Sequence, residues 1–269
     1  MIFFIFVLIA GVLVITKLNE LPLIGQKVAI IPVRGEITTE GCPCNIFGCE
    51  ECAEVKTIKE MLEIADNDIT IKAIVLDINS GGGGVIASND MMNIVKKVKK
   101  PVVARIGEIC TSGAYLVASA ADKIVADKNS ITGSIGVVMY FQQYYGLMEK
   151  LGLNMTVIKS GNNKDIGSPY RPMREDERKE LKEIVDKVFE NLIEEIAENR
   201  KLPVEYVRNI SDGSIYLGSD AKKLGLVDEL GTLDDAINLA GKLGNVKGKP
   251  GVKEVVKKRS LLDILLKRG

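Results

Sequence analysis

The stretch Gly107-Glu-Ile-Cys-Thr-Ser112-Gly-Ala-Tyr-Leu-Val-Ala-Ser-Ala-Ala-Asp-Lys-Ile124 decides how the rest of the chain is organised. The apolar segment 101–106 precedes it and predicts a strand, whereas the small and apolar residues 113–121 predict a buried helix. Ser112 stands at the corner between them, beside the free N–H groups and the positive dipole end of a helix N-terminus. Such a corner suits a serine nucleophile, because a developing anion is stabilised there. It equally suits a serine that only caps the helix.

The chain of 269 residues contains no histidine. This excludes a Ser-His-Asp triad, a Cys-His pair and any histidine metal ligand within one chain. If Ser112 is a nucleophile, its base must be another group, and a lysine kept neutral by burial is the attested alternative. The 36 basic and 36 acidic side chains balance, so charge gives no argument for nucleic-acid binding.

The N-terminal segment 1–18 is predicted to be a transmembrane anchor. Residues 2–16 are almost wholly apolar and uncharged, and Lys17 follows them. At about 1.5 Å per residue they span about 23 Å, somewhat less than the ~30 Å hydrocarbon core of a bilayer. A cleaved signal peptide is the alternative, but no basic residue precedes the apolar run and no small-x-small site follows it. We therefore expect a single-pass protein of the cell membrane, with one further domain over 19–269.

Four of the five cysteines lie in the Cys-rich loop 41–52. They are Cys42, Cys44, Cys49 and Cys52. Thiolates this close could bind zinc or an iron–sulfur cluster, or form two disulfides in any of three connectivities. Their spacing matches no strong metal motif, so both interpretations stay open and no cofactor is expected. The fifth cysteine, Cys110, is interpreted as a small buried side chain.

Strands and helices alternate along the chain, which predicts an α/β fold. The further predicted strands are 27–33, 71–78, 123–126, the end of 132–139, and 154–158; the further predicted helices are 53–65, 85–99, 142–151, 174–201 and 234–243. Between strand 71–78 and helix 85–99, the run Asn79-Ser-Gly-Gly-Gly-Gly-Val85 frees backbone N–H groups to approach a ligand. No Gly-Lys-Ser/Thr follows, which excludes a Walker motif. The run is either a flexible connector or a donor of N–H groups to an oxyanion. The tail 247–269 is basic and contains an apolar segment, 261–266, that could pack on a partner or a membrane surface.

Several segments together resemble the signal peptide peptidase A family of membrane-anchored serine peptidases. They are the Gly-rich turn 79–85, the block Thr111-Ser-Gly-Ala-Tyr115 with its later Ala121-Asp-Lys-Ile124, Thr132-Gly-Ser-Ile-Gly136, Lys159-Ser-Gly-x-x-Lys164, and Ala221-x-x-x-Gly225-Leu-Val-Asp228. The resemblance covers about 27–243 and implies the Clp/crotonase-like fold of repeated ββα units. It also implies an extracytoplasmic peptidase domain, which favours disulfides over a metal, and a homo-oligomeric ring.

The same resemblance assigns roles to residues at the matching positions. Ser112 matches the nucleophile, Lys164 the general base and Ser134 the serine that orients the lysine, while Gly83 and Gly113 match the two donors of the oxyanion hole. Where the family turn has Ser-Pro-Gly-Gly, this chain has Gly81 in place of the proline, which removes a restraint on φ. The implied activity is that of a Ser-Lys endopeptidase that hydrolyses signal peptides or other apolar peptides at the membrane surface.

Two alternatives compete with the peptidase. The first is a crotonase-type acyl-CoA enzyme that uses the same oxyanion hole with acidic acid/base groups. The second is a non-catalytic, membrane-anchored scaffold whose Cys-rich loop and tail recruit partners. Sensitivity to serine-directed reagents separates the first from a peptidase, and function that survives Ser112→Ala would identify the second.

Overall fold

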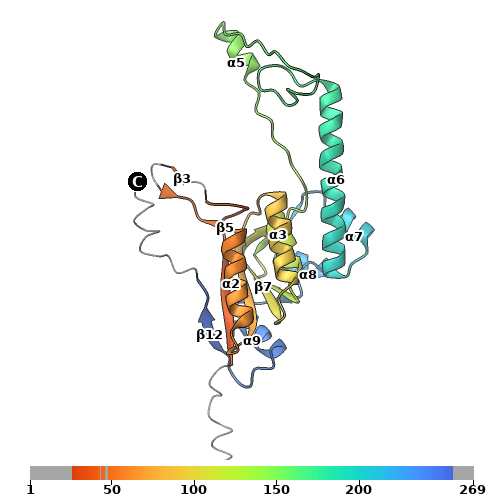
Figure 1. Cartoon of the computed structure of the whole chain (residues 1–269). Helices are drawn as coiled ribbons and strands as arrows, with labels where there is room; N and C mark the ends of the chain where they lie inside the picture. The colour runs from red at the N-terminus through yellow and green to blue at the C-terminus, as the bar shows by residue number, and fades with distance from the viewer. Residues whose placement is uncertain (1–25, 43, 46–47, 257–269) are drawn as a thin grey trace, which may run out of the picture.

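The computed structural model describes residues 26–42, 44–45 and 48–256, which form an eight-stranded, mostly parallel sheet with helices on both faces (Figure 1). The strands of this sheet are β1 (Lys27–Arg34), β6 (Ile71–Ser80), β7 (Val102–Thr111), β8 (Lys123–Ala126), β9 (Ile131–Gly133), β10 (Ile215–Leu217), β11 (Glu229–Leu230) and β12 (Gly251–Glu254). Their order is β10-β9-β7-β6-β1-β12, with β8 pairing both β7 and β11. Only the β9–β10 pair is antiparallel among them. The α/β prediction is confirmed, and the parallel-rich sheet is consistent with a Clp-like fold.

Strand β7 is longer than predicted and has two different neighbours on one side. Its first half, Val103–Ile106, pairs with β8, and its last residues, Ile109–Thr111, pair with β9. On its other side Cys110 pairs with Ser80 of β6. The ends of β6, β7 and β9 therefore lie together, and the chain segments that follow each strand meet at one edge of the sheet.

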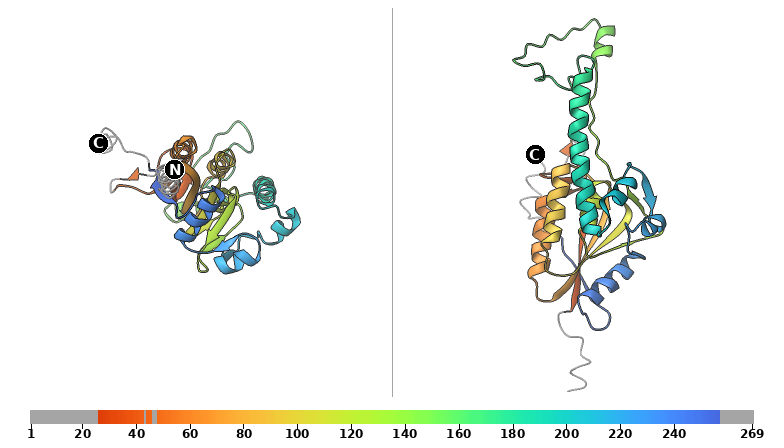
Figure 2. Two further views of the ribbon diagram at one scale, coloured as in Figure 1. Left: turned by 90° about the horizontal axis from the view of Figure 1, so that it is seen from below. Right: turned by 90° about the vertical axis from the view of Figure 1, so that its right-hand side faces the viewer.

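Helices cover the two faces unequally (Figure 2). On one face lie α2 (Val55–Asn67), α3 (Val85–Lys96) and α4 (Gly113–Ser119), and on the other lies α9 (Leu233–Leu243). The apolar stripe of α2 faces the sheet: Ile58, Met61, Leu62 and Ala65 are buried, and Val55 is partly buried. Full burial of one such large aliphatic side chain contributes about 1.5–3 kcal/mol, so this stripe fixes α2 in place.

A long arm, residues 137–188, projects from this core (Figures 1 and 2). It comprises an extended segment, the short helix α5 (Tyr145–Lys150), a loop, and the first half of α6 (Glu175–Arg200). The second half of α6 packs on α4 through Ile193 and Ile196, which are fully buried. Two further short helices, α7 (Val204–Asn209) and α8 (Gly218–Lys223), return the chain to the sheet.

The arm is where the predicted secondary structure was wrong. The predicted strand 154–158 and the strand expected at the end of 132–139 have no regular structure, and the predicted helix 142–151 is shortened to α5. A strand needs a neighbour to satisfy its backbone N–H and C=O groups, and no strand lies beside these segments within the described chain. Their apolar side chains are exposed; Ile158, for example, is 96% exposed.

A disulfide closes the Cys-rich loop. Cys42 and Cys52 are bonded at 2.02 Å, and the bond links the segment after β2 (Glu36–Thr38) to the start of β5 (Cys52–Glu54). The strands β3 (Cys44–Asn45) and β4 (Gly48–Cys49) form a hairpin between them. Because two of the four sulfurs are bonded to each other, the structure has a disulfide in this loop and not a four-thiolate metal site.

Within the described ranges, no helix is both long and apolar enough to cross a membrane. This finding contradicts the prediction that the protein is located in the cell membrane. The segment 1–18, on which that prediction rested, lies outside the described residues. Of the predicted tail 247–269, residues 251–254 form β12 and residues 257–269 lie outside the described residues.

Candidate active site

Ser112 lies at a strained corner where β7 ends and α4 begins. Its φ of 54° and ψ of −127° are rare for a residue with a side chain, a conformation that costs about 1–3 kcal/mol. The corner is held by the N–H of Ser112, which donates to Gly133 at 2.9 Å, and by its carbonyl, which accepts from Leu116 at 3.1 Å. The side chain does not cap α4, so the capping interpretation is wrong. The half-buried hydroxyl makes no hydrogen bond to any residue that the structure describes.

The Gly-rich turn after β6 lies directly against this corner. Thr111 donates its hydroxyl to the carbonyl of Gly81 at 3.1 Å. Gly82 has a φ of 101°, and a Cβ there would lie 2.9 Å from the nitrogen of Gly113 and 3.0 Å from the Cβ of Ser112. Only glycine permits both this backbone conformation and this close approach.

Ile37 of β2 braces the turn from the other side. Its N–H donates to Gly82 at 2.9 Å, and its carbonyl accepts from Gly84 at 3.1 Å. The residue between them, Gly83, lies near Gly113, since a Cβ on Gly113 would be 3.5 Å from the nitrogen of Gly83. Neither the N–H of Gly83 nor that of Gly113 takes part in the backbone hydrogen bonds of the turns and caps described around them. Two backbone N–H groups without partners in these turns thus lie close together beside Ser112.

Gly83→Ala is expected to disrupt this site, because a Cβ at Gly83 would lie 2.1 Å from the carbonyl oxygen of Ile37. The turn must then separate from β2, and we expect kcat to fall at least about 10²-fold, the effect of losing one oxyanion donor. Gly84→Ala is the matched control, because its Cβ would meet only Ala87 at 3.7 Å and the far side of the Ile37 carbonyl at 4.0 Å. Peptidase rates and thermal unfolding midpoints of both variants test this, and equal rates for the two would contradict it.

Ser134 lies close to Ser112, because it is the residue that follows the end of β9. The carbonyl of the preceding residue, Gly133, accepts a hydrogen bond from the N–H of Ser112. The N–H of Ser134 donates to the carbonyl of Ser214 at 2.7 Å. Like Ser112 it has a positive φ, 45°. The structure therefore brings together the predicted residues Ser112, Ser134, Gly83 and Gly113. Sequence reasoning missed Ile37, which carries no motif and acts through its place in β2.

Lys164 is not beside Ser112 within one chain. It is exposed and lies in the loop 159–170, which is tied to the N-terminal end of α6. At the other end of α6, Asn199 donates to Ser119 at the C-terminal end of α4 at 2.9 Å. The helix from Glu177 to Asn199 is about 33 Å long, so the loop lies at the outer end of the arm, away from the core that contains Ser112 (Figure 1).

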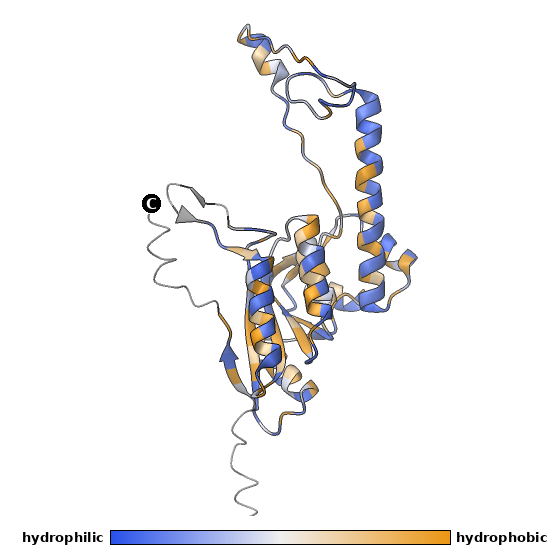
Figure 3. Cartoon of the chain, in the orientation of Figure 1, coloured by the Kyte–Doolittle hydropathy of each residue, from blue (hydrophilic) through white to orange (hydrophobic). Residues whose placement is uncertain are grey.

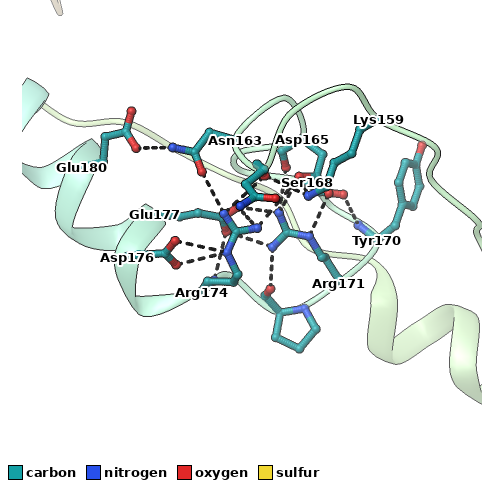
Figure 4. A network of polar contacts seen from close by, with 12 residues as sticks. Lys159, Asn163, Asp165, Ser168, Tyr170, Arg171, Arg174, Asp176, Glu177 and Glu180 are labelled. Carbon is teal, nitrogen blue, oxygen red and sulfur yellow. Dashed lines mark hydrogen bonds and ion pairs between the residues drawn. The ribbon is translucent and has the colours of Figure 1, made fainter.

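A dense ion-pair network fixes this loop to the N-terminal end of α6 (Figure 4). Arg171 donates to both carboxylate oxygens of Glu177, and Arg174 forms a further ion pair with it at 2.9 Å. The Glu177 side chain is fully buried, and its hydrogen bond with Arg171 lowers the pKa of the carboxyl from 4.5 to about 2. Arg171 and Lys159 also hold the pKa of Asp165 well below its usual value. The residue next to Lys164 is thereby anchored to α6.

The network predicts an acid-sensitive loop. Because the pKa of folded Glu177 is depressed, its contribution to stability is complete above about pH 4.5 and is lost as the pH falls towards 2. Glu177→Gln should remove this contribution already at pH 7 and so loosen the loop. An added protease should then cleave within 159–172 at least about tenfold faster than in the wild type. Glu175→Gln is the control, because that side chain is 91% exposed. Equal protection of the loop at pH 7 and pH 3 would contradict the prediction.

Cys110 is not part of the site, although it precedes Ser112 by only two residues. It is fully buried, and burial raises the pKa of its thiol far above neutrality. A thiol kept protonated in the core is a poor nucleophile. The interpretation of Cys110 as a core side chain agrees with this environment.

Comparison with known proteins identifies the family. The model of peptidase family S49 matches residues 94–247, more than half of the chain, and the model of Clp protease matches residues 47–131. The chain belongs to peptidase family S49. A member of family S49 is a serine-type protease, and the matched region contains Ser112, Ser134 and Lys164. The resemblance to the signal peptide peptidase A family is thereby confirmed.

Several relatives of this S49 chain bear names that agree with this assignment. It is 42% identical over 224 residues to a putative protease of Methanocaldococcus jannaschii, covering 82% of this chain and 72% of that protein. It is 32% identical over 216 residues to a putative signal peptide peptidase SppA of Enterococcus faecium, covering 79% of this chain and 62% of the relative. It is 30% identical to Protease 4 of Haemophilus influenzae, covering 85% of this chain and only 37% of the relative.

A solved structure shares the fold. It is a serine-to-alanine mutant of the 1510-N membrane-bound stomatin-specific protease, with a TM-score of 0.58 over 88% of this chain and 100% of that chain. The identity is only 13%, so this likeness supports the architecture alone.

Proposed function

We propose that this S49 chain hydrolyses apolar peptides, signal peptides among them, with Ser112 as nucleophile and Lys164 of the partner subunit as general base. The observation that carries the proposal is the Ser112 hydroxyl, which has no hydrogen bond within the described structure and lies at a strained corner beside the N–H groups of Gly83 and Gly113. A nucleophile must be free of competing hydrogen bonds and close to donors that stabilise the charge it generates.

The proposed reaction is acyl transfer. Ser112 attacks the peptide carbonyl and passes its proton to a neutral lysine amine, while the two N–H groups hold the oxygen of the tetrahedral intermediate. The lysine then returns the proton to the leaving amine, and water hydrolyses the acyl-enzyme by the same route. Ser134, next to the residue bonded to Ser112, would orient the lysine. A chain without histidine can carry out every step of this sequence.

Placing the base on another copy follows from the arm. The loop that carries Lys164 lies at the outer end of the arm, away from Ser112 in the core of its own chain. The arm that carries it exposes large apolar side chains: Val138 is 71% exposed, Tyr140 87% and Leu151 64%. Figure 3 shows hydrophobic residues among hydrophilic ones along the arm. A groove of about 660 Å³ between the extended segment and α6 is lined by Met139, Leu181 and Val185, among others. An apolar surface of this extent indicates a protein interface, and head-to-tail contacts between identical copies close into rings. The expected homo-oligomer is therefore part of this proposal.

Apolar peptides are proposed as substrates for two reasons. Val138 and Met139, which follow Ser134 along the chain, are apolar and exposed, so they offer apolar contacts to a peptide that lies near Ser134. One relative is named a putative signal peptide peptidase. Membership of family S49 also favours the peptidase over the acyl-CoA enzyme and the scaffold.

Three assays on the full chain test the proposal. We expect cleavage of an apolar signal-like peptide, slower cleavage of a charged peptide of equal length, and labelling of Ser112 by a fluorophosphonate. Hydrolysis of an acyl-CoA without peptide cleavage would support the crotonase-type alternative. An absence of both peptide cleavage and labelling would support the scaffold.

A further inference from the structure

Ser88 has a buried hydroxyl without a hydrogen-bond partner among the described residues. It lies in the first turn of α3 and is only 1% exposed. A helical serine usually donates to the carbonyl four residues before it, here Gly84, but only the backbone N–H of Ser88 uses that carbonyl, at 2.9 Å. Because a buried hydroxyl without a hydrogen bond destabilises the folded chain, its presence calls for a physical reason.

The hydroxyl lies against the residue that follows the nucleophile. A Cβ on Gly113 would be 2.1 Å from Oγ of Ser88 and 2.9 Å from its Cβ. The same point is 3.5 Å from the nitrogen of Gly83. Helices α3 and α4 pack on each other along this line. Ser88 therefore lies between the Gly-rich turn, which supplies the Gly83 N–H, and the start of α4, which supplies the Gly113 N–H.

This placement makes Ser88 a spacer with two fixed ends. Its backbone is bonded to Gly84, in the turn that carries the Gly83 donor, and its Oγ contacts the backbone that carries the Gly113 donor. A hydroxyl oxygen allows a closer approach to a glycine Cα than a methyl group does, because Cα–H···O contacts are weakly attractive at about 3.3–3.6 Å. The hydroxyl oxygen of Ser88 can therefore pack against the Gly113 backbone at the short distance that the absence of a Cβ on Gly113 allows.

We propose that Ser88 is a positioning residue of the oxyanion hole, which sets the distance and direction of the Gly83 and Gly113 N–H groups through its contact with Gly113. The inference rests on the proposed function, since it assigns those N–H groups to the stabilisation of the tetrahedral intermediate. It also explains why the hydroxyl is kept at a cost in stability. A misplacement of about 1 Å in a catalytic group lowers rates up to about 10²-fold.

Ser88→Ala is the variant that separates positioning from folding. Removing an unsatisfied hydroxyl should leave the thermal midpoint equal or raise it. The contact with Gly113 is lost, so kcat should fall at least about tenfold with KM unchanged, within the range that misplacement of a catalytic group produces. The rate of fluorophosphonate labelling should fall by a similar factor, because the phosphonyl oxygen occupies the same hole. Affinity for a peptide boronic acid should fall likewise.

Ser119→Ala provides the matched control on the neighbouring helix. Ser119 is also fully buried, but its hydroxyl donates to Leu116 at 2.7 Å and accepts from Asn199 at 2.9 Å. This variant should show the opposite pattern, a lower thermal midpoint with kcat maintained.

The outcomes separate the inference from the function on which it rests. An active wild type whose Ser88→Ala variant keeps kcat and labelling rate within about twofold overturns the positioning role, since misplaced donors cost more than that. A wild type that neither cleaves peptides nor reacts with the fluorophosphonate overturns the proposed function, and the inference with it.

Discussion

Ser112→Ala is expected to lower kcat for peptide hydrolysis by at least about 10⁴-fold, because loss of the nucleophile leaves only binding and the oxyanion hole. The thermal midpoint should stay the same. The Ser112 side chain makes no hydrogen bond within the described structure, and alanine keeps the same Cβ at the same backbone angles. Measurements of kcat and of thermal unfolding on the same preparation check both expectations.

Ser160→Ala is the control for this prediction, because that serine is exposed in the loop 159–170 of the arm. It should have the activity of the wild type. A Ser112→Ala protein that retained even about a tenth of the wild-type kcat would show that another residue attacks the peptide, and the site described above would be wrong.

The second large effect concerns two inactive variants that restore each other. Lys164→Ala alone should be nearly as inactive as Ser112→Ala, since both halves of the dyad act as a unit. If the dyad joins neighbouring copies, Ser112→Ala and Lys164→Ala chains refolded together form some sites with both residues intact. For random mixing in a closed ring, about a quarter of the sites are restored, so activity should reach about a quarter of the wild-type value.

Two controls make this mixing experiment decisive. A chain that carries both substitutions, mixed with Ser112→Ala, has no source of an intact site and should stay inactive. Lys150→Ala, an exposed lysine at the end of α5, should be fully active alone. A mixture no more active than its components would contradict the intersubunit dyad, and an active Lys164→Ala chain would show that the base is another residue.

Local sequence patterns predicted the parts of the site that neighbouring residues determine. The strand, the corner at Ser112 and the buried helix after it follow from the change from an apolar run to small residues, and the glycine run marks a turn that needs close backbone contact. Residues 71–80 and 102–111 are largely buried on both faces, and such strands give strong signals.

Tertiary contacts determined what the sequence left open. Ile37 supports the Gly-rich turn only because β2 lies beside it, and nothing at position 37 marks that role. The spacing of the cysteines allowed three pairings, and only the packing of β2 on β5 brings Cys42 to Cys52. Similarly, polar and apolar residues alternate over 154–157 as they do in a strand, but strand formation also needs a partner strand.

The position of Lys164 could not be predicted because a motif fixes sequence distance and not direction. Helix α6 runs from the loop at the outer end of the arm to its contact with α4 in the core, so its length places the loop far from the strand ends. The resemblance between motifs therefore supplies the candidate residues, and the path of α6 is the reason why we propose that they come from different copies of the chain.

The separation of core and arm gives the protein two kinetic steps of different order. The core buries its own apolar side chains, so its folding is a first-order process whose rate is independent of protein concentration. The arm leaves Tyr140 and Ile158 almost fully in water, and in the proposed assembly another copy covers them, which is a second-order event. A freshly diluted, fully folded chain should therefore show a lag before hydrolysis begins, and the lag should shorten as the concentration rises.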